Sequence, residues 1–375
     1  MTTPTTRATT RPDRVVGALR DLVAFHRTGP QWPTATQSAV AITLPLLAFS
    51  LAGHLTFGLT ASLGSFLVVH LPDRSRRERA AQLPVIMVGF LVAALAGIAT
   101  ATSLVAGLAA ILAVAIASSL LGLALDAGSP GSMFYVLITG AAGSLTAPAS
   151  LQGAAVDPLL VLAMISLGML CAYGVVLAPL ALPSVRRRDA ELFAARPARR
   201  FAFTADVERI FVRLTVATVL AVATSATLDL HRVQWVLLAV IAILQKDSEV
   251  RLSMLRALHR VVGTAIALVV FYLIALWDPD GIVLVALIGV LMFLFKILQP
   301  RNLGLSLVAV TPMALVIAAK GAGQPLIEIV GVRVEDTALG ATVAIVVLAA
   351  VTATRSLSAR HLHARAGQVE RRRVG

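Results

Sequence analysis

Residues 102–125 read TSLVAGLAAILAVAIASSLLGLAL, a run that carries no charged side chain. About 20 consecutive apolar residues are enough for a helix to cross the hydrocarbon core of a bilayer. Similar or somewhat shorter apolar runs flank this stretch on both sides. The 375-residue chain is 58% hydrophobic and 14% charged, whereas soluble domains carry about 25% charged residues. These values exclude an ordinary soluble enzyme and indicate a polytopic membrane protein.

The whole chain divides into apolar runs separated by short polar segments. The expected membrane-spanning runs are 36–53, 56–71, 83–100, 102–125, 132–148, 158–182, 207–228, 233–246, 261–277, 281–297, 303–319 and 337–353. If the N-terminus is cytoplasmic, 29 of the 32 Lys and Arg side chains fall on the cytoplasmic side. Lys and Arg are concentrated on that side in membrane proteins. The sequence therefore predicts an all-α membrane protein with about twelve transmembrane helices and both termini in the cytoplasm.

An internal repeat is predicted from the charged loops. A forward shift of 174 residues places Asp73 on Asp247, Arg77 on Arg251 and Gly89 on Gly263. Both halves would start inside, so the repeat would be parallel. The predicted organisation is a cytoplasmic tail, a first six-helix repeat, a basic linker, a second six-helix repeat and a basic cytoplasmic tail. Their respective ranges are 1–35, 36–183, 184–206, 207–353 and 354–375.

The sequence lacks the motifs of several functional classes. The chain has no phosphate-binding loop of the G-x4-G-K-S/T type and no H-E-x2-H or C-x2-C pair. We therefore expect no enzyme activity, no cofactor and no metal site. The net charge is +13, but only three Tyr and three Trp are available to stack on bases. Nucleic acid is therefore not an expected partner, and the basic residues are interpreted as topological signals.

The stretch Gln234–Ala267 reads QWVLLAVIAILQKDSEVRLSMLRALHRVVGTAIA. It resembles the FUSC family of fusaric acid resistance-like and aromatic acid exporter-like membrane proteins in a Trp-containing short helix, a polar loop and an Arg-x2-Gly-Thr segment. Trp235, Gln245, Arg260, Gly263 and Thr264 match these positions. The first half carries a weaker version of the pattern. The chain departs from the family in having Ala267 where a further Gly is expected and in having only a short linker between its halves.

The second and eighth runs are too short for a full crossing and occupy matching places in the two halves. Short or broken helices at corresponding positions often mark the central site of a transporter. The predicted substrate-binding residues are accordingly Thr60, Ser62, Trp235, Gln245 and Arg260. The alternative is that the small polar residues only pack against neighbouring helices.

Charged residues near the second and eighth runs complete the predicted site. Arg260 could bind a carboxylate through its planar guanidinium or simply anchor the helix at the membrane surface. Asp247 is its expected ion-pair partner, as Asp73 is for Arg77, and the two aspartates are the predicted coupling residues. Lys296 is expected to reach the cytoplasmic surface.

Gly263, Thr264 and Gly89 are predicted to be structural. Gly263 and Gly89 would let the third and ninth runs approach the short second and eighth runs closely. Gly263→Ala would then be mild, whereas a leucine at either position would separate the helices.

The resemblance implies a secondary transporter that exports small aromatic or amphipathic organic acids, or related toxic compounds, across the cytoplasmic membrane. The expected partners are a small organic anion and the lipid bilayer, and a homo-oligomer is left open. Two alternatives remain open. One is an anion channel similar to half of a plant malate channel, and the other is a membrane scaffold without transport activity.

Overall fold

The computed structural model describes residues 24–125, 128, 130–194, 202–228, 232–246, 249–328, 331 and 334–353. Every regular element within these residues is an α-helix or a short 3₁₀ helix, which confirms the predicted all-α class. The first-half helices are α2 (Trp32–Leu51), α3 (Leu55–Ser65), η1 (Phe66–Val69), α4 (Arg76–Ala99), α5 (Leu104–Ala124), α6 (Met133–Thr146), η2 (Ala149–Leu151), α7 (Pro158–Leu177), η3 (Ala178–Ala181) and α8 (Pro183–Ala194). The remaining ones are α9 (Ala205–Thr227), α10 (Val233–Leu244), α11 (Val250–Trp277), α12 (Gly281–Leu298), α13 (Leu303–Gly321), η4 (Leu326–Glu328) and a C-terminal helix, Val334–Ala353.

Each predicted apolar run falls on one of these helices. Within the described residues, nine helices are long and apolar enough to cross a membrane, so the chain is a multi-pass membrane protein. Three apolar helices are shorter: Leu55–Val69, Met133–Thr146 and Val233–Leu244. The first and third are the short runs noted in the sequence, and the second was not singled out there. The count of twelve crossings and the positions of the termini stay predictions.

The chain forms two compact units, and each unit takes helices from both predicted repeats. Unit 1 comprises Met1–Leu91, Val156–Arg196 and Leu258–Val334, and unit 2 comprises Val92–Ala155, Pro197–Ala257 and Glu335–Gly375. The unit boundaries fall inside α4 and α11. The compact units therefore do not follow the boundaries 36–183 and 207–353, because packing groups helices that lie far apart in the sequence.

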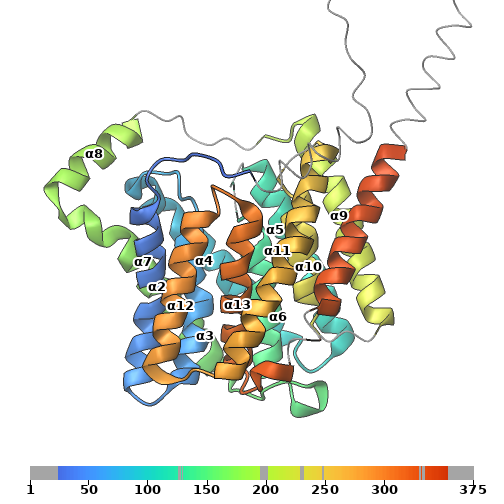
Figure 1. The fold of residues 1–375 in the computed structure, drawn as a ribbon, viewed down its shortest axis with the longest axis horizontal. Helices are drawn as coiled ribbons and strands as arrows, with labels where there is room; N and C mark the ends of the chain where they lie inside the picture. The colour runs from blue at the N-terminus through green and yellow to red at the C-terminus, as the bar shows by residue number, and fades with distance from the viewer. Residues whose placement is uncertain are drawn as a thin grey trace, which may run out of the picture. The chain divides into compact units, whose positions relative to one another are not determined.

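In unit 1, α2 packs against α12, α3 and α7, and α3 also contacts α13; Figure 1 shows α2 and α12 side by side. The α3–α7 contact depends on two glycines. A Cβ on Gly64 would overlap the carbonyl oxygen of Ile165, and one on Gly168 would overlap that of Ala61. Small residues at such crossings allow backbones to approach closely in a membrane, where apolar burial gives no preference for protein over lipid.

In unit 2, α10 packs against α9 and α6, and α5 contacts both α6 and α9. Most of the residues of α10 are buried, from Val233 to Leu244. A hydrophobic core surrounds it, contributed by α5, α6, α9, α11 and the C-terminal helix. The C-terminal helix approaches α10 at Gly340, where a Cβ would lie 2.6 Å from the carbonyl oxygen of Val236.

The two units repeat the same set of helix contacts. Under the shift of 174 residues, α2, α3, α5, α6 and α7 correspond to α9, α10, α12, α13 and the C-terminal helix. The contact of α12 with α2 in unit 1 then matches that of α5 with α9 in unit 2, and α13 with α3 matches α6 with α10. In both units the fourth and fifth helices of one half pack against helices of the other half, and the internal repeat stays a prediction.

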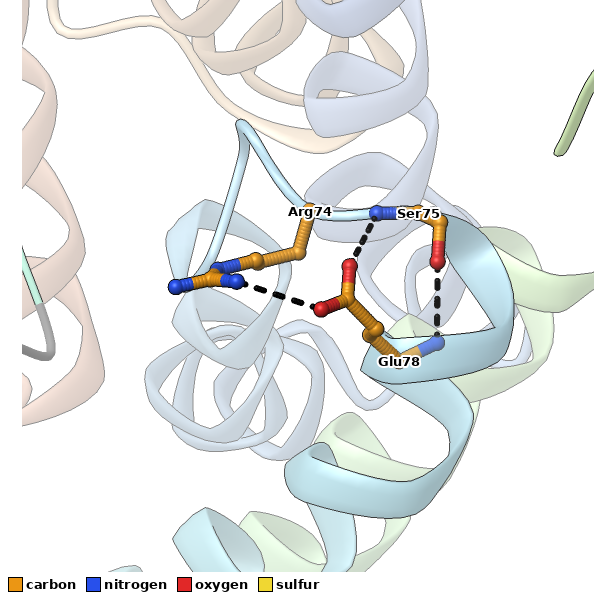
Figure 2. A network of polar contacts seen from close by, with 3 residues as sticks. All are labelled: Arg74, Ser75 and Glu78. Atoms are coloured by element: carbon orange, nitrogen blue, oxygen red, sulfur yellow. Dashed lines mark hydrogen bonds and ion pairs between the residues drawn. The ribbon is translucent and has the colours of Figure 1, made fainter. Parts of the chain in front are cut away.

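The start of α4 is fixed by local and distant hydrogen bonds. Ser75 and Glu78 form a capping box, in which the Ser75 N–H donates to Glu78 Oε2 at 3.0 Å and the Glu78 N–H donates to Ser75 Oγ at 3.2 Å (Figure 2). Arg74 adds an ion pair to Glu78 at 3.2 Å. Asp189 of α8, within the predicted linker, accepts from the N–H groups of Arg76 and Arg77 at 2.6 and 3.0 Å. These bonds satisfy N–H groups that a helix start otherwise leaves free and set the position of Arg79.

Candidate functional site

The two short helices that the sequence singled out are buried elements of their units. Residues 58–71, which include most of α3 and all of η1, are buried without interruption. The α10 helix of unit 2 is buried along most of its length. A helix that ends inside a protein leaves its last carbonyl groups without intrahelical partners. Those ends attract cations, because the helix dipole is negative there.

In unit 1, Arg79 binds the end of η1. Its Nη2 donates to the Val68 carbonyl at 2.6 Å, and its Nη1 donates to Gln37 Oε1 at 3.3 Å. Gln37 in turn donates to the carbonyl groups of Val175 and Val176 of α7. Arg79 is only 4% exposed, and its Nε–H has no acceptor among the described residues. Arg79 is therefore a buried cation with one unused donor.

Lys296, in the last turn of α12, lies close to this group. It is 7% exposed, so the expectation that it reaches the surface is wrong. Its Nζ donates to Gln299 Oε1 at 3.2 Å and lies 5.7 Å from the centre of the Phe295 ring. Arg79 and Asp73 are both near enough to act on its charge. The interior position follows from α12 packing against α2 along its length.

His70 lies at the end of η1 in the same unit. Its ring meets the Phe90 ring edge-on, with 5.2 Å between centroids. Arg79 and Lys296 both lie near enough to act on its charge. The ring of His70 therefore borders the two buried cations.

In unit 2, two arginines bind the end of α10. Arg213 of α9 donates to the Leu244 carbonyl at 2.7 Å, and Arg256 of α11 donates to the Ile243 carbonyl at 3.2 Å. Gln245, which directly follows α10, belongs to a network of neutral hydrogen bonds. Its Oε1 accepts from the N–H and the hydroxyl of Ser132, both at 3.3 Å, and the Ser119 and Ser132 hydroxyls are 2.8 Å apart.

Arg260 lies within the apolar span Leu252–Trp277 and is 8% exposed. Its Nε–H has no acceptor among the described residues. Thr264, one turn later on the same helix face, is 2% exposed, and its hydroxyl also has no described partner. Asp247, the expected partner of Arg260, lies outside the described residues. The pair Arg260 and Thr264 thus places unused hydrogen-bonding groups inside unit 1.

The other predicted binding residues are distributed between the two units. Trp235 and Gln245 stand at opposite ends of α10, ten residues or about 15 Å apart along the axis, so they do not share one small site. Thr60 and Ser62 are two residues apart on α3 and face different sides of it. The Thr60 hydroxyl donates to the Thr56 carbonyl at 3.0 Å, and that of Ser62 donates to the Gly58 carbonyl at 3.0 Å.

Gly263 makes a close crossing, but with a different helix from the predicted one. A Cβ on Gly263 would lie 2.7 Å from the Gly304 carbonyl oxygen of α13. We therefore now expect alanine to be destabilising there, because a backbone carbonyl cannot move aside as a side chain can. Gly89 is half-buried in α4. The tight contact of α4 is made instead by Gly97, where a Cβ would overlap the Thr139 carbonyl of α6.

Unit 2 also contains a cavity of about 90 Å³ lined by residues of the ends of α4 and α6 and the starts of α5 and α10. Gln234 lines it and covers Gly140, where a Cβ would lie 2.5 Å from Gln234 Cβ. No acidic or basic side chain lines this cavity, so it offers neutral hydrogen-bonding groups only. Within the described residues there is also no cluster of three or more His, Cys, Asp or Glu side chains that could hold a metal ion.

The comparisons with known proteins include a family match in the second half of the chain. Residues 216–347 match the model of the fusaric acid resistance protein-like family. This match confirms the resemblance predicted from Gln234–Ala267. An uncharacterized membrane protein of Bacillus subtilis (strain 168), YvaC, is 30% identical over 129 residues. The match covers 33% of this chain and 20% of that protein. No solved structure matches the chain.

The sequence alone did not indicate the roles of three residues near the site. Arg79 directly follows the sequence Ser75-Arg-Arg-Glu78, which is a capping box before an apolar run, so its place in the first turn of a helix was predictable. Gln37 and Asp189 carry no such local signal. Their roles depend on contacts with segments more than 40 and 110 residues away, respectively.

Proposed function

We propose that the chain is a secondary transporter that exports small aromatic or amphipathic organic acids across the cytoplasmic membrane. The observation that carries this proposal is Arg260, a buried guanidinium whose Nε–H has no described acceptor. A cation placed at the centre of a membrane helix costs about 3 kcal/mol. Such residues typically mark a transport path, and guanidinium binds carboxylates through paired hydrogen bonds.

The family match supports the proposal. Arg260, Gly263 and Thr264 lie inside the matched range 216–347, and the family description names resistance to fusaric acid, an organic acid. Thr264 would supply a neutral donor one turn from Arg260. Because the sequence contains no phosphate-binding loop, transport would be driven by an ion gradient.

The test is uptake of benzoate and of fusaric acid into vesicles containing Arg260 variants. We expect Arg260→Ala to lower the rate more than tenfold with normal membrane insertion. Arg260→Lys should recover little, because a point charge does not reproduce the planar pair of donors. Arg209→Ala is the matched control, since Arg209 is an exposed arginine paired with Asp206 at 3.1 Å. Full activity in Arg260→Ala would exclude a substrate-binding role for this residue.

The same vesicles separate the alternatives. Flux that requires a proton gradient supports an exporter, flux down the anion gradient alone supports a channel, and no flux of any tested anion supports a scaffold. The direction of transport depends on the topology. Reporter fusions after residues 75 and 195 and at the C-terminus should all report cytoplasm, and a periplasmic signal at 195 would contradict the parallel repeat.

A further inference from the structure

We propose that Arg79 and Lys296, with Gln37 holding Arg79 in place, form a second anion-binding site, which takes one small monovalent anion such as a halide or the carboxylate of an organic acid. The site lies in unit 1, where residues of α2, α4 and α12 meet the end of η1. It is independent of Arg260. Arg79 and Gln37 lie outside the family match, whereas Lys296 lies inside it.

The helix register brings Lys296 to the level of Gln37. The α2 and α12 helices run antiparallel, because His26, before α2, donates its N–H to the Arg301 carbonyl, after α12, at 2.9 Å. Midway along the pair, a Cβ on Gly289 would lie 2.8 Å from Thr43 Cγ2. Lys296 is seven residues after Gly289, and Gln37 is six before Thr43. Since both helices rise about 1.5 Å per residue, the two side chains start at nearly equal height.

The hydrogen bonds of both cations go to neutral acceptors. The Arg79 partners are the Val68 carbonyl and the Gln37 amide oxygen, and the Lys296 partner is the Gln299 amide oxygen. Asp73 acts on Lys296 from an exposed position, whereas the charge that acts on Arg79 is that of another cation, Arg76. Neither cation therefore donates to a buried carboxylate among the described residues.

Buried charges in proteins are normally paired with opposite charges, because desolvation is costly. An anion held between Arg79 and Lys296 would supply that pairing and would also accept from the unused Arg79 Nε–H. Both cationic residues are more than nine-tenths buried. This enclosure favours a small free anion over the headgroup of an anionic lipid.

The experiment measures the thermal midpoint of the purified full-length protein in detergent while chloride or benzoate replaces HEPES at constant ionic strength. A saturating anion should raise the midpoint of the parent by about 3 °C. Lys296→Met should abolish this rise. Lys320→Met is the matched control and should keep it, because Lys320 is a partly exposed lysine of the same unit that pairs with Asp278 at 2.6 Å.

Three further results determine the interpretation. Arg79→Gln should also lose the response; if that variant does not fold, Lys296→Met carries the test alone. An unchanged response in Lys296→Met would overturn the proposal. A response lost in Arg260→Ala but kept in Lys296→Met would place the anion at Arg260, leaving the proposed function intact and this site refuted. A rise with phosphatidylglycerol nanodiscs but with no free anion would assign the cations to a lipid and also refute it.

Discussion

The end of η1 in unit 1 and the end of α10 in unit 2 present the same physical problem, which is a short buried helix with unpaired carbonyl groups. Both units place a buried arginine there, Arg79 on Val68 and Arg213 on Leu244. Unit 1 then adds Lys296, whereas the residue 174 positions earlier is Gly122. A Cβ on Gly122 would lie 3.7 Å from Gln245 Nε2. The position of Lys296 is therefore cationic in unit 1 and neutral in unit 2, where Arg256 supplies the second cation at the end of α10.

This difference shows that similar sets of helix contacts can hold different side chains. Arg79 of α4 and Arg256 of α11 lie on helices that correspond under the shift of 174 residues, but Arg79 corresponds to Ser253 and not to Arg256. Arg213 comes from α9. Both units therefore place two cations near the end of the short helix, whereas a lysine at the position of Lys296 is specific to unit 1.

The largest expected effect concerns the crossings that hold the short helices. Gly168→Ala places a methyl group against the Ala61 carbonyl in unit 1 and should destabilise the protein by about 3 kcal/mol, the upper part of the range for overpacking. Gly340→Ala, which tests α10 of unit 2, should cost about 2 kcal/mol, because its methyl would lie 2.6 Å from the Val236 carbonyl oxygen.

The measurement is thermal stability of the purified variants in detergent. Gly174→Ala is the control on α7, because nothing lies within 4 Å of its added Cβ. It should be neutral or slightly stabilising, since alanine favours a helix more than glycine does. Equal stability of Gly168→Ala and Gly174→Ala would contradict the close α3–α7 crossing.

The next largest loss of stability is expected for the arginines that bind the ends of the short helices, Arg213 and Arg79. Arg213→Gln removes a charge-assisted hydrogen bond to a buried carbonyl and should cost about 2 kcal/mol. Arg79→Gln should cost less, about 1 kcal/mol, because it also relieves repulsion with Lys296. Unfolding monitored in detergent, with the exposed Arg209→Gln as control, measures both. A greater loss in Arg79→Gln than in Arg213→Gln would show that the unit 1 cations are already compensated.

Gly263 tests the α11–α13 crossing of unit 1. Gly263→Ala should lower stability by about 1 to 2 kcal/mol, since the Cβ would lie 2.7 Å from the Gly304 carbonyl oxygen. Gly89→Ala serves as the comparison in the corresponding position of α4 and should be close to neutral. Similar losses at both positions, measured as thermal midpoints, would indicate that the two helices make equivalent crossings after all.

The sequence by itself determined the membrane class, the helix positions and the family resemblance. These properties depend on local composition: long uncharged runs such as 102–125 can only be accommodated as helices in a bilayer. The short helices were also visible, because length is a local property, and the Ser75–Glu78 capping box could have identified the place of Arg79.

Only the tertiary structure decided which helices share a unit and which charges are buried. The sequence around Lys296 is typical of a lysine at the membrane surface, and the packing of α12 on α2 buries it. The sequence around Gly263 does not indicate that its neighbour is Gly304. Trp235 and Gln245 are close in the sequence motif but stand at opposite ends of one helix. Burial and pairing arise from contacts between residues tens to hundreds of positions apart, such as Gln37 with Arg79, and no local pattern of residues specifies these contacts.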